Sequence, residues 1–482
     1  MLVKFYKTAV VVGIGILVYF LITVPLLLFT SLIIISILIF ILAFLRNQFS
    51  QLDTIEKKTI QTVSSYPFIS IHIAICNEPP NMVINTLRSA LAINYPNYEV
   101  IVLDNNTKDK QLWKPVENFS KHYHDKIKFR HFEKLSGFKA GALNECLKIS
   151  HPETKYIFTV DADYQVEPEC LITALAETQN RDFALVQFPQ YYLNESKKGI
   201  LKELDHFFKF YARSGNKNSS TLPTGTLSFI KLDALRKVGG WPTNSLTEDA
   251  RLGLDLLHKN FKTRYSNRCI GKGIIPGTLE DLRKQRNRWV FGNVQCLKDL
   301  LRLKMPFKSK FSAFMQLTAW VNLLAFPIIS SLLYIILSIF NLEKEYHLLP
   351  LLIFIQFGIF ILGKLLLLVQ NRKDLDLEFR GFLVHLALSF EMAFAFWPVF
   401  LSRTPGFIRT CKFKAVTSLS SIPLKIPLIL AIISGLLMYQ GQELLAISFF
   451  LLFSIFLSSS LYIYHEYKPV QTNLNVKTES RL

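Results

Sequence analysis

The sequence predicts an α/β domain inserted between membrane-length apolar helices, which together make a polytopic α-helical membrane protein. The first observation is uneven hydropathy: half of the 482 residues are hydrophobic, and they concentrate at the two ends of the chain. The second is the texture of the middle segment, where short apolar runs alternate with helical patterns and polar residues follow each run. This alternation indicates a parallel sheet with its ligand site at the carboxyl ends of the strands.

The N-terminal segment predicts a pair of membrane helices. Residues 9–45 contain no charged side chain. A single helix of this length would measure about 55 Å, nearly twice a hydrocarbon core of about 30 Å. Two spans with a turn near Pro25 fit better. A signal peptide, with Lys4 and Lys7 at its basic end, is the competing interpretation, but the run is too long and no small-residue cleavage site follows.

Apolar runs return after Pro306, and the run at 381–402 is the exception among them. As a membrane span it would place the basic residues that follow it outside, against the positive-inside tendency. It also carries His385 and Glu391, which are costly at lipid depth. We therefore expect an interfacial or re-entrant helix there. The expected organisation is a hairpin (1–46), an interfacial linker (47–67), a cytosolic catalytic domain (68–300), transmembrane and interfacial helices with a basic loop at 403–425 (301–466) and a polar tail (467–482).

The net charge of +19 has two interpretations, nucleic-acid binding and attraction to a membrane surface. Many Lys and Arg residues flank apolar runs, as the positive-inside rule and anionic lipid require. No nucleic-acid module is visible, so we expect membrane lipids and no nucleic acid among the partners. The six cysteines form no CxxC pair and are expected to be reduced thiols.

Acidic residues follow three of the expected strands. Residues 69–75 end at Asn77-Glu78, residues 98–103 end at Asp104, and residues 156–160 run into Asp161-Ala162-Asp163. Alternating carboxylates at a strand end offer oxygen ligands to Mg²⁺ or Mn²⁺, which also bind a diphosphate. For Asp104 the alternative is an Asx turn with the two asparagines that follow it.

Three further motifs carry groups suited to phosphate and sugar chemistry. Lys139 precedes small residues that open a helix, where free amides and a point charge suit a phosphate. Thr247-Glu248-Asp249 precedes an amphipathic helix, and its alternative role is a helix cap with two acids in the first turn. Gln285-Arg286-Asn287-Arg288-Trp289 offers bidentate phosphate binding and a flat indole, or else a basic interfacial helix with a Trp anchor.

Together these pieces resemble the membrane-embedded family 2 glycosyltransferases of the cellulose, hyaluronan and chitin synthase type. The resemblance covers roughly 70–289, from the first strand to the Arg-Trp motif. It implies a GT-A nucleotide-sugar transferase domain and an inverting hexosyltransferase that depends on Mg²⁺ or Mn²⁺. It also implies a multi-pass protein of the plasma (inner) membrane with the catalytic domain in the cytosol.

The resemblance implies a role for each motif residue. Asp249, beside Glu248, is the expected catalytic base, and Asp161 and Asp163 are the expected metal ligands. The residues expected to bind the nucleotide-sugar donor are Glu78, Asp104, Lys139, Asp161, Gln285 and Arg288, and those expected to bind the acceptor are Trp289, Thr224 and Gly225. The stretch 186–190 resembles one that these synthases carry between their two aspartate motifs.

Two functions follow, and the sequence favours the first. A processive synthase would polymerise a β-linked polysaccharide and move it across the membrane through its own helices. A non-processive transferase would glycosylate a lipid, such as a sphingolipid or polyprenyl phosphate. The complete motif at 285–289, helices on both sides of the catalytic domain and the basic loop favour the growing glycan as acceptor. UDP-glucose is the expected donor, with GDP-mannose and UDP-N-acetylglucosamine left open.

Overall fold

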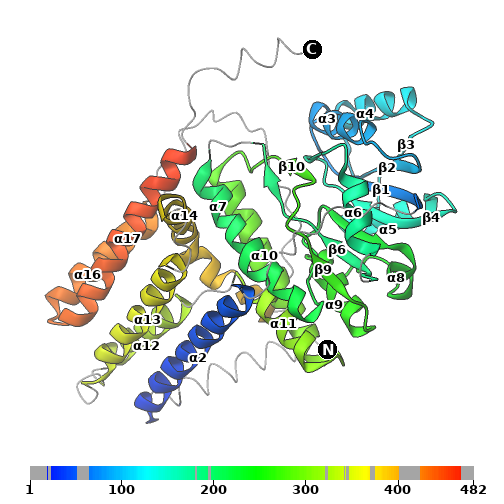
Figure 1. Cartoon of the computed structure of the whole chain (residues 1–482). Helices are drawn as coiled ribbons and strands as arrows, with labels where there is room; N and C mark the ends of the chain where they lie inside the picture. Colours follow the sequence, from blue (N-terminus) through cyan, green and yellow to red (C-terminus); the bar gives the residue numbers. More distant parts are fainter. Residues whose placement is uncertain are drawn as a thin grey trace.

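The computed structural model describes residues 19, 23–51, 65–179, 182–193, 197–320, 324–340, 342, 347–369, 375–400 and 424–467. In Figure 1 the apolar helices α2, α12, α13, α16 and α17 stand together on one side of the molecule, and the sheets lie on the other side. Helices α7 (Lys198–His206) and α10 (Leu279–Arg302) run between these two parts.

The main sheet has seven strands in the order β3-β2-β1-β4-β8-β6-β9. Strands β1 to β4 are parallel to one another. Three of these strands have the bounds that the apolar runs predict, within about two residues. The bounds are β1 (Phe68–Ile75), β2 (Tyr98–Asn105), β3 (Ile127–Phe132), β4 (Thr154–Thr159), β6 (Leu185–Gln187), β8 (Ser228–Lys231) and β9 (Thr263–Tyr265).

The sheet is mixed, which corrects the expected all-parallel arrangement. Strand β8 runs antiparallel to both β4 and β6. In this register Thr159, the last residue of β4, pairs with Ser228, the first residue of β8. The antiparallel direction therefore brings the residues before β8 to the edge where the parallel strands end.

A second, three-stranded sheet has the order β5-β10-β7. Its strands are β5 (Gln165–Val166), β7 (Tyr191–Tyr192) and β10 (Gly271–Gly273). The helices of this sheet-containing part are α3 (Pro80–Leu91), α4 (Lys110–His122), α5 (Phe138–Ile149), α6 (Cys170–Gln179), α7, α8 (Leu232–Lys237), α9 (Glu248–His258) and α10, with a π-helix η1 (Phe207–Ala212) and a 3₁₀ helix η2 (Arg213–Asn218) after α7.

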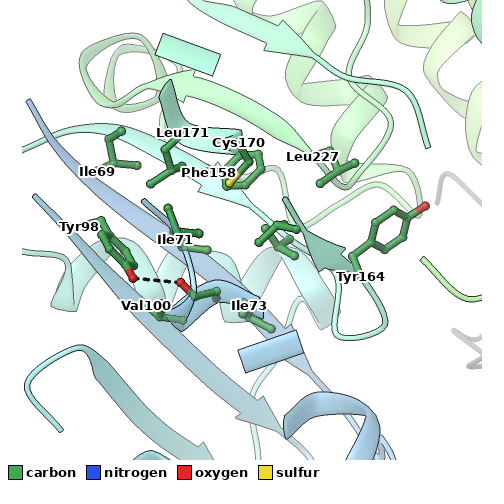
Figure 2. Close-up of a cluster of buried hydrophobic side chains, with 14 of the residues drawn as sticks. Ile69, Ile71, Ile73, Tyr98, Val100, Phe158, Tyr164, Cys170, Leu171 and Leu227 are labelled. Carbon is green, nitrogen blue, oxygen red and sulfur yellow. Dashed lines mark hydrogen bonds between the residues drawn. The ribbon is translucent and has the colours of Figure 1, made fainter. Parts of the chain in front are cut away.

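One hydrophobic core cluster lies on one face of β1 and its neighbours, and other clusters cover the opposite face. Ile69, Ile71 and Ile73 alternate along β1 and are fully buried, packed with residues such as Phe158 and Leu171 (Figure 2). Burial on both faces of central strands requires near-continuous apolar sequence, which is the pattern that made these strands predictable.

The apolar helices pack into a separate cluster. The helices are α2 (Pro25–Gln51), α12 (Ala325–Ile339), α13 (Leu349–Val369), α14 (Leu375–Phe394), α16 (Lys425–Tyr439) and α17 (Glu443–Tyr467). Helix α2 begins at the expected turn at Pro25, while nearly all of the first arm of the predicted hairpin lies outside the described residues. The basic loop at 403–425 lies outside them too, apart from its last two residues.

Two segments of the described chain, Glu378–Val399 and Glu443–Tyr467, are long and apolar enough to cross a membrane. Four shorter apolar helices accompany them. The first apolar stretch after Pro306 contains two helices, α11 (Phe307–Leu317) and α12. Helix α11 packs on the sheet-containing part, where Gln316 accepts a hydrogen bond from Leu222 N (2.8 Å) and donates one to Ser220 O (2.8 Å).

Helix α14 lies against the sheet-containing part. Its apolar residues share a cluster with α7 and α10. Two of its acids are paired by side chains of the same helices: Glu378 with Lys202 at 2.7 Å and Glu391 with Arg283 at 3.3 Å. These pairs relieve the cost that a charged side chain would have at lipid depth. The interfacial placement of this segment stays a prediction.

Candidate active site

A cleft of about 1300 Å³, a volume that includes space open to solvent, lies at the carboxyl ends of β1, β2 and β4. Eleven of the twelve sequence-predicted site residues line it: Glu78, Lys139, Asp161, Asp163, Thr224, Gly225, Glu248, Asp249, Gln285, Arg288 and Trp289. Residues separated by more than 200 positions in the sequence thus meet in one place.

Asp104 is the predicted residue that does not line the cleft. Its carboxylate is buried and accepts hydrogen bonds from Thr107 Oγ1 (2.6 Å) and His131 Nδ1 (2.6 Å). The residues of this strand end that line the cleft are Asn105 and Asn106. Asp104 therefore lies beneath the residues that line the cleft, where its hydrogen bonds stabilise the end of β2. Its contact with a nucleoside stays a prediction.

Lys139 joins three parts of the site from the first turn of α5. Its ammonium group donates hydrogen bonds to the carboxylate of Asp161 and to Gly225 O (2.7 Å). Burial lowers the pKa of Lys139, but the negative charges of Asp161, Glu248 and Asp249 outweigh burial and raise it overall. The lysine is therefore a fixed positive charge at the centre of the cleft.

The Thr247-Glu248-Asp249 triplet begins helix α9. The Thr247 side chain makes no cap hydrogen bond, so the alternative role as a side-chain cap is not realised. Asp249 Oδ1 accepts a hydrogen bond from Ala250 N (2.8 Å). Burial, followed by the negative charge of Glu248, raises the pKa of Asp249 to about 7. A carboxylate with this pKa can accept a proton near neutral pH.

Gly225 lies directly against Asp249. Its φ of +87° is in the left-handed region, and a Cβ at this position would lie 3.1 Å from Asp249 Oδ2. Glycine is the residue that satisfies both constraints. The loop is held from behind by the stretch 186–190: Gln187 Oε1 accepts a hydrogen bond from Thr224 N (2.9 Å), and Gln190 Nε2 donates one to Thr224 O (2.8 Å).

Helix α10 presents the Arg-Trp motif with two different orientations. Arg288 and Trp289 line the cleft, together with Gln285. Burial lowers the pKa of Arg288, although the nearby carboxylates oppose that effect. Arg286 points away from the cleft and is almost fully buried, where Nη2 and Nε donate to the two carboxylate oxygens of Glu203 at 2.6 and 3.2 Å.

Arg286 also supports the indole of Trp289. Its guanidinium lies 4.3 Å from the centre of the Trp289 ring and 5.1 Å from that of Trp320. The two indoles are 5.2 Å apart. Sequence reasoning assigned no role to Glu203 or Trp320, because one lies in a helix without a motif and the other in a run with membrane-like hydropathy. Only their contacts identify them.

The cleft carries an excess of negative charge. Among the described residues that line it, five are acidic (Glu78, Asp161, Asp163, Glu248 and Asp249) and two are basic (Lys139 and Arg288). Two cations inside a carboxylate-rich cleft at strand ends, with an indole beside a carboxylate of raised pKa, are suited to transferring a group from a phosphorylated donor. These features are those of a group-transfer enzyme, a transferase.

Comparison with known families agrees with this class. The model named Glycosyl transferase family 2 matches residues 70–239, and the model named Glycosyl transferase family group 2 matches residues 156–364. The part of the chain that these models match, residues 70–364, is of the family 2 glycosyltransferase type.

Relatives with curated functions act on different acceptors. The β-monoglucosyldiacylglycerol synthase of Trichormus variabilis is 29% identical over 48% of this chain and 50% of its own length. Glucomannan 4-β-mannosyltransferase 9 of Arabidopsis thaliana is 27% identical over 48% of this chain and 45% of its own length. The poly-β-1,6-N-acetyl-D-glucosamine synthase of Staphylococcus epidermidis is 27% identical over 46% and 54%.

The chain therefore spans about half the length of the curated relatives it matches. Among solved structures, the mannosyltransferase PcManGT of Pyrobaculum calidifontis, in complex with GDP-mannose and Mn²⁺, is 16% identical over 71% of this chain and 99% of its own, with a TM-score of 0.47. That likeness is too distant to carry an argument.

The buried Glu203–Arg286 pair yields a stability prediction. Replacing Glu203 by Ala leaves a buried guanidinium without its carboxylate, and we expect a loss of about 3–5 kcal/mol in the free energy of unfolding. Combining Glu203→Leu with Arg286→Leu should cost less than Glu203→Ala alone. Thermal unfolding in detergent measures both.

The matched control is an exposed ion pair, Lys148 with Glu145 at 2.6 Å. Lys148→Ala should change stability by less than about 1 kcal/mol. Equal effects at Glu203 and Lys148 would contradict the account of the buried pair.

Proposed function

We propose that the protein is an inverting, processive transferase that extends a β-linked polysaccharide from a nucleotide-sugar and passes the product across the membrane. UDP-glucose is the proposed donor. The observation that carries the proposal is the shared cleft, in which the carboxylate of Asp249, the cations Lys139 and Arg288 and the indole of Trp289 lie together.

The donor end of the cleft requires a divalent cation on electrostatic grounds. A nucleotide diphosphate is an anion, and the cleft it must enter already carries more carboxylates than cations. Among the described residues, no group of three or more His, Cys, Asp and Glu side chains is arranged to hold a metal by itself. Mg²⁺ is usually bound by one or two carboxylates together with substrate phosphates, and Asp161 and Asp163 fit that donor set.

Asp161 and Asp163 would therefore hold Mg²⁺ or Mn²⁺. The metal would neutralise charge on the diphosphate as it leaves. Lys139 and Arg288 would hold the same leaving group, Lys139 as a point charge and Arg288 with its planar fork of donors. Asp161 N donates a hydrogen bond to Thr226 Oγ1 (3.0 Å). This bond holds the end of β4 against the loop that carries Thr224 and Gly225.

Asp249 is the proposed base for sugar transfer. It would take the proton from the acceptor hydroxyl while that oxygen forms a bond to the anomeric carbon. The bond from the same carbon to the diphosphate oxygen breaks, and the diphosphate departs with the electron pair. Attack opposite the leaving group turns an α-linked donor into a β-glycoside.

The acceptor side favours a saccharide chain. A second cavity of about 520 Å³, again counting space open to solvent, shares Thr224, Asp249 and Trp289 with the main cleft. Its other aromatic walls are Phe207, Phe208 and Trp320. A row of aromatic rings next to the base suits successive sugar rings. The alternative is a non-processive enzyme that makes a glycolipid, which the named activity of the Trichormus variabilis relative keeps open.

Location in the plasma (inner) membrane, with several spans and a cytosolic catalytic domain, is part of the proposal. Two helices of membrane length and four shorter apolar ones support it. Helices α7 and α10 connect the catalytic cleft to this apolar cluster through α14.

The experiment that tests the function offers the purified protein UDP-glucose, GDP-mannose and UDP-N-acetylglucosamine with Mg²⁺ or Mn²⁺ and sizes the product. We expect a long β-linked chain from one donor. Trp289→Ala should shorten the chain while donor hydrolysis persists, because stacking is worth on the order of 1 kcal/mol beyond burial and water needs no platform. A single sugar on an extractable lipid would overturn the processive proposal.

The assignment of the base predicts both a mutant effect and a pH dependence. Asp249→Asn keeps the size of the side chain but removes proton acceptance, so transfer should fall roughly 10²–10⁴-fold while the KM for donor changes little. Because the carboxylate must be ionised to act and its pKa is raised to about 7, wild-type kcat should rise with pH through that value. A flat profile, or near-normal transfer by Asp249→Asn, would exclude this base.

A further inference from the structure

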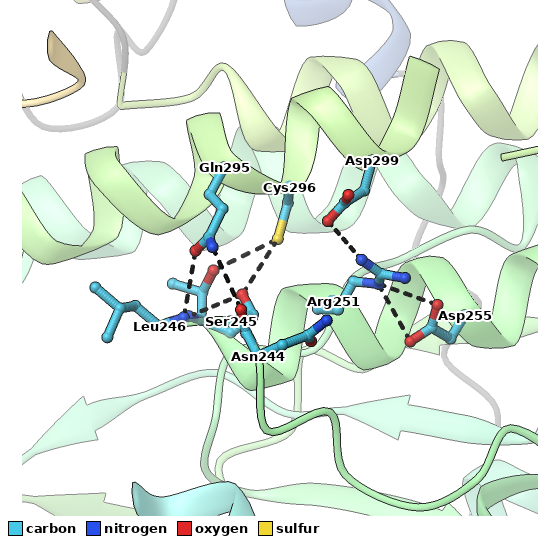
Figure 3. Close-up of polar contacts among 9 residues, drawn as sticks. Asn244, Ser245, Leu246, Arg251, Asp255, Gln295, Cys296 and Asp299 are labelled. Carbon is cyan, nitrogen blue, oxygen red and sulfur yellow. Dashed lines mark hydrogen bonds and ion pairs between the residues drawn. The ribbon is translucent and has the colours of Figure 1, made fainter. Parts of the chain in front are cut away.

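Helix α10 continues past the Arg-Trp motif with a face that holds the segment carrying Asp249. Gly292, Gln295, Cys296 and Asp299 recur at helical spacing and therefore lie on one side of the helix. Figure 3 shows three of them, Gln295, Cys296 and Asp299, above the segment 244–255, which belongs to the loop before α9 and to α9 itself.

Thr247 is seated directly on this face. It is buried, and its Oγ1 lies 3.6 Å from Cys296 Sγ, within hydrogen-bond distance for sulfur. A Cβ added to Gly292 would lie 2.4 Å from Thr247 Cγ2. Real Cβ atoms do not approach other atoms that closely, so any side chain at 292 would push Thr247 away.

The neighbours of Thr247 are held by the same face. Ser245 Oγ lies 3.8 Å from Cys296 Sγ and accepts a hydrogen bond from Thr247 N (3.3 Å). Gln295 Nε2 donates to Asn244 O (3.3 Å). Two residues beyond Asp249, Arg251 forms an ion pair with Asp299. The triplet is therefore fixed from outside by α10, since its own threonine does not cap the helix.

We propose that Gly292 and Cys296 are positioning residues for the base. They hold Thr247 against α10 and thereby fix the position of Asp249 relative to the indole of Trp289. The proposal rests on the assignment of Asp249 given above. Helix α10 carries both Trp289 and the residues that contact Thr247. The distance between Trp289 and Asp249 therefore depends on a single rigid element. Cys296 itself does no chemistry, and burial raises the pKa of its thiol to about 12.

The test compares four variants of the full-length protein. Gly292→Ala should lower kcat at least tenfold while the KM for donor stays within about twofold of wild type, since the donor end is untouched. It should also shift the rising limb of the pH profile, because the pKa of Asp249 depends on its burial and on the nearness of Glu248. Cys296→Ala should do the same to a lesser degree.

Cys296→Ser keeps the approximate size and the hydrogen bonding of the side chain, so the pH profile of kcat should rise at the same pH as in the wild type. Val294→Ala is the control for a buried change on α10: Val294 lies in another cluster, which includes Leu246 but no residue of the triplet. This variant should lower the unfolding temperature and leave kcat and its pH profile unchanged.

Two outcomes would overturn the proposal. In one, Gly292→Ala leaves kcat and the limb unchanged. In the other, Gly292→Ala lowers activity only in proportion to the folded fraction and does not shift the pH profile of kcat, which is the behaviour expected of Val294→Ala. If Asp249→Asn is inactive, either result rejects the positioning role but leaves the assignment of the base intact. Normal transfer by Asp249→Asn would instead reject the base.

Discussion

The structure depends on one electrostatic constraint, which is the excess of carboxylates around Lys139 in the cleft. Lys139 pairs with Asp161 and faces Glu248 and Asp249, and these charges keep its own pKa high despite burial. Burial, followed by the negative charge of the adjacent Glu248, raises the pKa of Asp249. A site of this kind would repel an anionic donor unless a cation entered with it. On the proposed function, donor binding, metal binding and the strength of the base would all follow from this one charge arrangement.

The fold brings this arrangement together through strand direction and one long helix. Parallel strands β1, β2 and β4 deliver their carboxyl ends to one edge, and antiparallel β8 delivers the Thr224-Gly225 loop to the same edge. Helix α10 closes the cleft with Arg288 and Trp289 and holds Thr247 one turn later. The apolar helices contribute through α14, two of whose acids are paired by Lys202 and Arg283. Catalytic and apolar parts thus share a packed boundary.

Much of this was predictable from local pattern. The strand at 68–75 is an apolar run that polar residues terminate, and the motif residues identify themselves by type and spacing. The direction of β8 was not predictable, because β-strand sequence carries no sign of whether a neighbour is parallel. The burial of Asp104 and the pairing of Arg286 with Glu203 also escaped, since the latter joins residues 83 positions apart. Side chains within one motif face opposite ways, and periodicity alone does not say which of them meets a partner.

Nucleotide binding measured with and without a divalent cation tests the central claim most directly. Titration of UDP or GDP into the purified protein should give a saturable isotherm with Mn²⁺ or Mg²⁺ and little or no binding in EDTA. Asp163→Asn should weaken the metal-dependent isotherm and leave the fold intact. Equally tight binding in EDTA, or an unchanged isotherm for Asp163→Asn, would contradict the account, because the carboxylate-rich cleft would then accept the anion unaided.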